Sequence, residues 1–179
     1  LAPLGDIQWN GEPREIALEH LKEHVTRAVD LKAKFIGMGD YIDFLSPSGR
    51  RKVAQADHYD NALKAFDHTA LRLNEELVSE VLQPTIGQWL GMLEGHHFAT
   101  LKAGMTSDME LCKQLETRFL GTSCIIKLNF YPRAGQITSF QLWAHHGKGS
   151  GKAARPIQIL EGVSGRWDDI DLFLIGHMT

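Results

Sequence analysis

Five short apolar stretches of this chain end beside a glycine that is paired with an aspartate or a histidine. These pairs are Gly5-Asp6, Gly39-Asp40, Gly95-His96, His146-Gly147 and Gly176-His177. Glycine allows a sharp backbone turn without a Cβ clash, and open α/β sheets bind their ligands beyond the carboxyl ends of the strands. One such pair is ordinary turn chemistry, whereas recurrence at five strand ends predicts that these carboxylates and imidazoles meet at one metal site.

Carboxylate oxygens and imidazole nitrogens together suit Mn, Fe or Zn better than Ca or Mg, which prefer shells made only of oxygen. We therefore expect a divalent metal cofactor, with Mn²⁺ favoured and Zn²⁺ or Fe as alternatives.

The elements that would carry these residues alternate between strands and helices, which predicts an α/β fold. Strands are expected over residues 1–4, 35–38, 89–93, 124–131, 136–144 and 170–175, with 132–135 closing a hairpin. Helices are expected over 13–31, over 57–82, over 108–119 and after Pro156. Ser107 is expected to cap the third helix, with Glu110 completing a capping box. The expected inner face of the 57–82 helix is Leu63, Phe66, Ala70, Leu73, Leu77 and Leu82.

Length and composition favour a single domain over residues 1–179. The net charge of −3 argues against a globally basic, nucleic-acid-binding surface. Two cysteines are too few for a disulfide framework, so a reducing, cytoplasmic location is expected. No apolar run has the length of a membrane span, so we expect no membrane partner.

The order of the motifs resembles that of the calcineurin-like metallophosphoesterases. In that family the run is Asp-x-His, Gly-Asp-x-x-Asp, Gly-Asn-His, His-Gly and Gly-His-x-His. Here the corresponding segments are 6–8, 39–43, 95–97, 146–147 and 176–179, which together span essentially the whole chain. The resemblance implies a two-sheet α/β/β/α sandwich. A family member would continue past Thr179 with more strands of the second sheet, which predicts a sandwich truncated at its C-terminus.

The resemblance also implies a role for each matched residue. One metal ion would be held by Asp6, Gln8 and the last position of the fifth motif, and Asp40 would bridge to a second ion. That second ion would be held by His96, His146 and His177. His97 would assist the leaving group, and Asp43 would be a structural hydrogen-bond acceptor rather than a ligand.

Three positions depart from the family pattern. Gln8 and Thr179 each replace a histidine at the same metal, whereas His96 replaces an asparagine at the other metal and adds a stronger donor. We predict that the ion near His96 binds tightly and that the ion near Asp6 and Gln8 is weak or absent.

The expected function is metal-dependent hydrolysis of a phosphate ester by a metal-activated water. Basic residues follow two of the strand ends and favour a phosphodiester, nucleic acid included, as in a nuclease. Arg50, Lys148 and Lys152 are the candidate substrate-binding residues, and simple solvated loop charges are the alternative. The alternative function is a catalytically weakened or inactive metal-binding interaction module of the same fold, which Gln8 and Thr179 favour. The sequence does not determine the natural substrate or the oligomeric state.

Five other residues have plainer interpretations. His145 precedes the ligand His146, and strand alternation sends it to the opposite face, so we expect it to be packed or hydrogen-bonded. Trp9 and Tyr41 either stack on a base or form the wall of the pocket. His20 and His24 lie four residues apart on the first helix, but no third ligand is near, so we interpret them as solvated.

Overall fold

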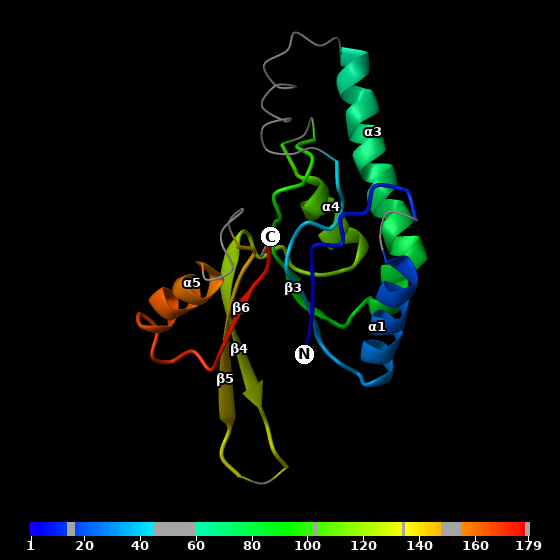
Figure 1. The fold of residues 1–179 in the computed structure, drawn as a ribbon. Coiled ribbons are helices and arrows are strands. Elements are labelled where there is room, and N and C mark those ends of the chain that lie inside the picture. The colour runs from blue at the N-terminus through cyan, green and yellow to red at the C-terminus, as the bar shows by residue number, and fades with distance from the viewer. Residues whose placement is uncertain (14–16, 45–59, 102–103, 134, 148–154, 178–179) are drawn as a thin grey trace.

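The computed structural model describes residues 1–13, 17–44, 60–101, 104–133, 135–147 and 155–177. Its strands form two three-stranded sheets in the middle of the molecule, and helices lie on the outside (Figure 1). The mixed α/β class expected from the sequence is therefore confirmed.

The first sheet contains β1 (Ala2–Leu4), β2 (Phe35–Gly37) and β3 (Trp89–Met92), in the order β1-β2-β3 with all strands parallel. The central strand, β2, is buried along its whole length. The loops after β1 and β2 continue side by side, because Asp6 N–H donates to Gly39 O (2.9 Å) and Gln8 N–H donates to Asp40 O (3.0 Å). The first two motifs are therefore fixed to each other by backbone hydrogen bonds.

Three helices pack with the first sheet around the larger of the two hydrophobic clusters. They are α1 (Leu18–Asp30), α3 (Asp60–Leu77) and α4 (Ser107–Gln114), with α3 continued by a π-helical turn at Val78–Leu82 and a 3₁₀ turn at Gln83–Thr85. Among the residues expected on the inner face of the long helix, Ala70, Leu73, Leu77 and Leu82 are buried, Phe66 is half-buried, and the side chain of Leu63 lies outside the described part. The helical spacing of apolar residues therefore located this face correctly.

The second sheet contains β4 (Ser123–Phe130), β5 (Thr138–His145) and β6 (Leu172–Ile175), in the order β4-β5-β6. The pair β4/β5 is the expected antiparallel hairpin, and it extends beyond the rest of the molecule (Figure 1). The strand β6 pairs parallel to β5 and follows α5 (Arg155–Ser164).

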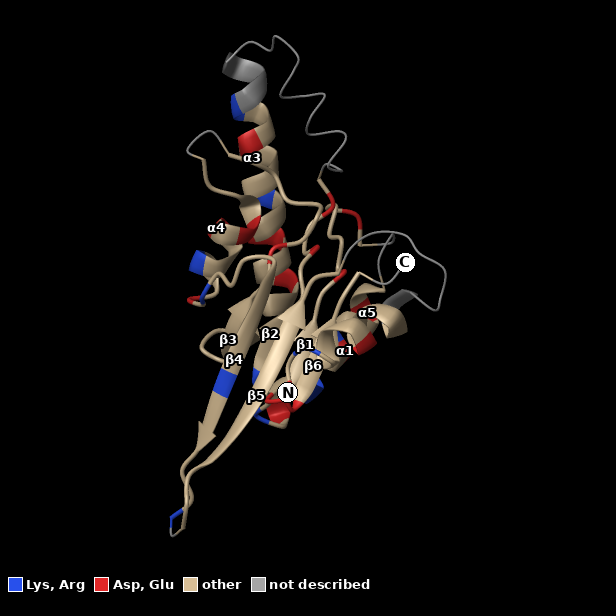
Figure 2. Ribbon diagram, turned by 90° about the vertical axis from the view of Figure 1, so that its left-hand side faces the viewer, with Lys and Arg blue, Asp and Glu red and all other residues tan. Residues whose placement is uncertain are grey.

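The two sheets share a second, smaller hydrophobic cluster. Ile36 of β2 packs there together with Leu142 and Ala144 of β5, and all three side chains are fully buried. The helices α1 and α3 lie on one side of the strands and α5 lies on the other (Figure 1). Acidic residues occur on the loops beyond the carboxyl ends of the strands (Figure 2).

Two details of α4 differ from the sequence prediction. The N-cap is Thr106, whose hydroxyl accepts a hydrogen bond from Met109 N–H (3.3 Å), whereas the hydroxyl of Ser107 accepts one from Ala99 N–H (2.9 Å). The expected capping box is therefore wrong. The helix also ends at Gln114 instead of reaching residue 119, because residues 118–121 hydrogen-bond to the free edge of β3.

No helix within the described part of the chain is long and apolar enough to cross a membrane.

Candidate metal centre

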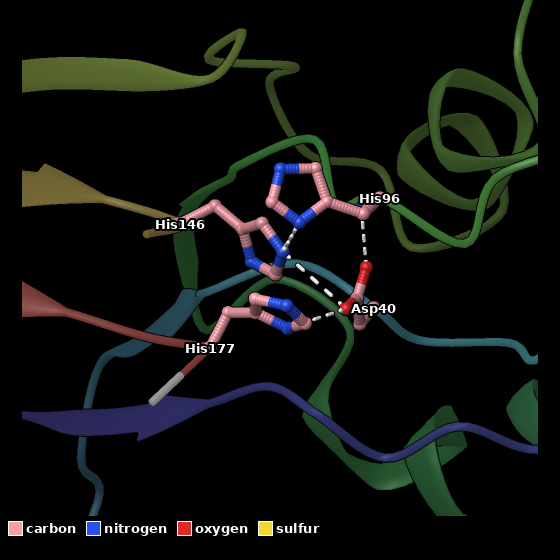
Figure 3. Close-up of side chains that lie close together, drawn as sticks. All are labelled: Asp40, His96, His146 and His177. Atoms are coloured by element: carbon pink, nitrogen blue, oxygen red, sulfur yellow. Dashed lines mark hydrogen bonds and ion pairs between the residues drawn. The ribbon is translucent and has the colours of Figure 1, made fainter. Parts of the chain in front are cut away.

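Four side chains from four different loops converge beyond the strand ends (Figure 3). They are Asp40, His96, His146 and His177, and each offers a ligand atom within 4.8 Å of the others. We call these four residues the metal-site cluster. All four were expected to be ligands from the sequence, and the structure brings them together.

Asp40, the carboxylate of the cluster, has 1% of its surface exposed. Its Oδ1 accepts hydrogen bonds from the backbone N–H groups of His96 and His97 (3.0 Å for His97). Its Oδ2 has no hydrogen-bond partner among the described residues, and the same is true of the buried Nδ1 of His177. Buried polar atoms are almost always paired, and these two atoms lie 3.1 Å from each other in a cluster that could hold a metal ion.

The spacing of the donor atoms fits a single ion. The Oδ2 atom of Asp40 lies 3.1 Å from His177 Nδ1 and 3.3 Å from His146 Nε2, which in turn lies 3.2 Å from His96 Nδ1. Atoms held about 2.1 Å from one ion in the usual tetrahedral or octahedral arrangements lie roughly 3.0–3.4 Å apart. These three pairs therefore have the spacing of donors around one divalent cation, and all the ligand atoms of the cluster lie within 4.8 Å of one another.

The ring of His146 is oriented by a backbone carbonyl of the first sheet. Its Nδ1 lies 2.6 Å from Met38 O, and because a carbonyl oxygen can only accept, Nδ1 carries the hydrogen. The lone pair is thereby left on Nε2, the atom that faces Asp40 and His96. A carbonyl or carboxylate bound to the far nitrogen of a ligand histidine is a common feature of protein metal sites.

Two glycines allow the loops to approach closely enough to form this site. Gly39 has a φ of +96°, and a Cβ there would lie 2.8 Å from the Cα of Gly95 and closer still to His146 Nδ1. A Cβ on Gly95 would overlap the backbone nitrogen and Oδ1 of Asp40. Any larger residue at either position would push the ligands apart.

The backbone of the site is held in an unusual conformation. Asp6, Gln8, Asp40 and His177 all have φ values between 46° and 55°. Residues other than glycine rarely occupy this left-handed region, and such strain is concentrated at functional sites, where it costs about 1–3 kcal/mol per residue. The hydrogen bonds between the loops must therefore offset this cost.

The charges in the cluster are coupled. Burial by itself would raise the pKa of Asp40, but the His146 imidazole and the two backbone N–H donors hold that pKa well below its ordinary value. Burial lowers the pKa of His146, yet Asp40 and the Met38 carbonyl raise it overall. Burial and the neighbouring imidazole of His146 lower the pKa of His96. Asp40 is therefore ionised and His96 is neutral, as a metal ion requires, whereas the proton that Asp40 favours on His146 would be released when an ion binds.

A second buried carboxylate, Asp108, fixes the turn that carries His96 and was not identified from the sequence. Its side chain is 2% exposed, and its Oδ2 accepts a hydrogen bond from Gly95 N–H (2.9 Å). Burial is the main cause that raises the pKa of Asp108 to about 6. The turn at residues 95–97 is thus held between Asp108 on one side and Asp40 on the other. The position of Asp108 at the start of a helix does not indicate this role in the sequence, because aspartate is common at helix starts.

Asp6 and Gln8, the residues expected to hold a second ion, are arranged differently from the metal-site cluster. The side chain of Asp6 is 42% exposed, and its Oδ2 accepts a hydrogen bond from the backbone N–H of His177 (3.0 Å). The Oδ1 atom of Asp6 lies 3.6 Å from His177 Nδ1, so this carboxylate borders the cluster. Gln8 is attached to the second loop through its backbone. Thr179 lies outside the described residues.

His97 stands beside the cluster and contacts Asp43. Its Nδ1 lies 2.8 Å from Asp43 Oδ1. This contact orients the ring and matches the acceptor role expected for Asp43.

The neighbouring aromatic residues and His145 are structural. Trp9 is 2% exposed and Tyr41 is fully buried, with its hydroxyl donating to Leu93 O (2.8 Å). Neither ring is therefore available to stack on a base. His145 stacks on Trp143, with ring centroids 5.6 Å apart, and its Nδ1 accepts a hydrogen bond from Gly147 N–H (2.7 Å). The expectation that His145 is packed and hydrogen-bonded is confirmed.

The remaining predictions concern substrate binding and the histidine pair of the first helix. The expected substrate-binding residues Arg50, Lys148 and Lys152 lie outside the described residues. His20 is exposed as expected, and it pairs with Glu23 on the same helix.

No family model, curated protein or solved structure matches this chain in the comparisons. The resemblance to the calcineurin-like metallophosphoesterases therefore rests on the motifs and their order.

Proposed function

We propose that this protein is a metal-dependent phosphoesterase whose metal-site cluster holds the catalytic cation. The observation that carries this proposal is the buried Oδ2 of Asp40, which has no hydrogen-bond partner among the described residues and lies 3.1 Å from His177 Nδ1 and 3.3 Å from His146 Nε2. An ionised oxygen in that position costs several kcal/mol unless a cation neutralises it. The two central sheets with helices outside support the α/β/β/α sandwich implied by the motifs.

The residues around the cluster would divide the work of hydrolysis. Asp40 would bind the ion, with Oδ1 held in place by two N–H donors. A divalent ion, when bound, would polarise a phosphoryl oxygen and lower the pKa of a water molecule. His97, oriented by Asp43, would give a proton to the leaving alkoxide, a role that contributes about 10²–10⁴-fold in rate.

We favour a phosphodiester, including nucleic acid, over a phosphomonoester. The support for this choice is the basic sequence that follows two of the motif-bearing strands, with Arg50, Lys148 and Lys152 as candidate contacts. Basic side chains neutralise the phosphate backbone of nucleic acids.

The test is turnover of bis(p-nitrophenyl) phosphate with added Mn²⁺ or Zn²⁺ by the unmodified chain and by Asp40→Asn. The asparagine variant keeps the shape of the side chain but removes the charge that binds the cation. We expect turnover in the unmodified chain only. Equal turnover in both proteins would remove this site from the reaction, and faster hydrolysis of p-nitrophenyl phosphate would reverse the substrate preference.

A second candidate function is a metal-binding interaction module with weak or no activity. It is favoured by Gln8, an amide at a ligand position, and by the contact of Asp6 with the His177 backbone. Metal analysis distinguishes the functions when it is combined with the assay above. One tightly bound ion without turnover supports the module, whereas two equally tight ions contradict our prediction of a weak second position.

A further inference from the structure

His96 gives the metal-site cluster three imidazole nitrogens and one carboxylate as its donors. Its Nδ1 faces Nε2 of His146 at 3.2 Å, and its ring meets the His146 and His177 rings edge-on, with centroids 4.5 and 4.8 Å apart. The third nitrogen therefore belongs to the same inward-facing set as the other two.

We propose that His96 makes this centre selective for zinc-class ions, that is Zn²⁺ or Fe²⁺, over Mn²⁺. This inference rests on the metal site of the proposed function. Imidazole suits Zn, Fe, Ni and Cu, whereas carboxylate, carbonyl and water ligands suit Mn, Mg and Ca. Three nitrogens against one oxygen favour zinc-class ions over Mn²⁺, the ion that the sequence analysis favoured.

The contact geometry supplies a matched substitution. In histidine Nδ1 is three bonds from Cα, and in asparagine Oδ1 is also three bonds from Cα. Because His96 presents Nδ1 to the cluster, His96→Asn would place an amide oxygen where the nitrogen was. The substitution replaces a nitrogen donor by an oxygen donor and keeps the position of the donor atom. It therefore isolates the effect of the nitrogen on metal selectivity.

Every site of this kind binds Zn²⁺ more tightly than Mn²⁺, so the informative quantity is the change in the affinity ratio. Metal-free chain and its His96→Asn and His96→Ala variants would be titrated with Zn²⁺ and with Mn²⁺ by calorimetry. Removing a residue that only hydrogen-bonds to a metal ligand already lowers metal affinity about 10–100-fold. We therefore expect His96→Asn to lower Zn²⁺ affinity at least about tenfold more than Mn²⁺ affinity. His96→Ala should weaken both ions.

One control excludes adventitious zinc on the exposed pair His20 and His24, which lie one helical turn apart on α1. A His24→Asn variant removes that pair and should keep the zinc affinity of the unmodified chain. Circular dichroism confirms that each variant is folded.

Two results would overturn the proposal. Equal loss of Zn²⁺ and Mn²⁺ affinity in His96→Asn would show that the nitrogen does not decide selectivity. Unchanged affinities in His96→Ala would show that His96 is not a ligand. Both results are independent of turnover, so failure of the phosphoesterase assay would leave the selectivity measurement standing.

Discussion

Replacing Asp108 by asparagine tests whether a buried carboxylate fixes the ligand-bearing turn at the cost of stability at neutral pH. Asp108 is 2% exposed, and burial raises its pKa from 3.8 to about 6. The amide of asparagine keeps an oxygen that can accept the hydrogen bond from Gly95 N–H. The variant therefore removes the ionisation of Asp108 and retains its contact.

The sign follows from the raised pKa. The folded protein binds the Asp108 proton more tightly than the unfolded chain, so this contribution to stability is complete below about pH 3.8 and is lost as the pH rises through about 6. A shift of about two pKa units corresponds to about 3 kcal/mol. By proton linkage, the free energy of unfolding falls by about 1 kcal/mol as the pH rises to about 4.5. Nearly all the remaining decrease, about 2 kcal/mol, occurs between about pH 4.5 and 7.5.

The assay is urea unfolding of metal-free protein across that pH range for the unmodified chain and for Asp108→Asn. We expect the stability of the variant relative to the unmodified chain to rise by about 2 kcal/mol from about pH 4.5 to 7.5. Other titrating groups are common to both proteins and cancel in the difference. The exposed Asp30, replaced by asparagine, serves as the surface control in the same measurement. A pH-independent difference for Asp108→Asn would refute the reasoning.

Three further outcomes are expected from the same geometry. Gly39→Ala should destabilise the fold by about 1–3 kcal/mol, because its backbone is left-handed and its Cβ would press on His146; thermal unfolding and zinc titration should both report the change. Asp43→Asn should lower kcat through His97 while zinc affinity stays unchanged, and an equal loss of affinity would place Asp43 among the ligands. Zn²⁺ at 100 times its Kd should raise the free energy of unfolding by about 2.7 kcal/mol. That gain should be absent in Asp40→Asn, and its persistence there would mean that zinc stabilises the fold from another position.

Most of the fold could be predicted because local patterns agree with the final packing. Apolar runs ending at glycine marked the strands, and helical spacing marked the inner face of α3. Local patterns failed where a distant partner decides the structure. The predicted helix included Arg118 and Phe119, but pairing of this segment with Met92 at the free edge of β3 keeps them out of the helix. Likewise, Ser107 could cap a helix, yet its hydroxyl is used by Ala99 in another loop.

The metal-site cluster could be predicted from the sequence, but the residues that support it could not. Its four members lie beside glycines at the ends of strands, which is a pattern that the amino-acid sequence alone shows. Asp108 occupies an ordinary helix-start position, and only the approach of Gly95 in three dimensions gives it a role. Asn74 is a similar case: it is buried in α3 and donates from Nδ2 to Ser107 O (2.7 Å), which ties α3 to the start of α4.

The cluster also connects the two sheets, so metal binding and folding should be coupled. His146, at the end of β5, donates to Met38 O beyond β2, and the His177 N–H beyond β6 donates to Asp6 beyond β1. Both contacts cross from the second sheet to the first and meet at Asp40, whose Oδ2 has no hydrogen-bond partner among the described residues. A cation that neutralises this carboxylate would strengthen the contact between the sheets, and its binding energy would contribute to folding. The same atoms thus serve the proposed chemistry and the assembly of the fold.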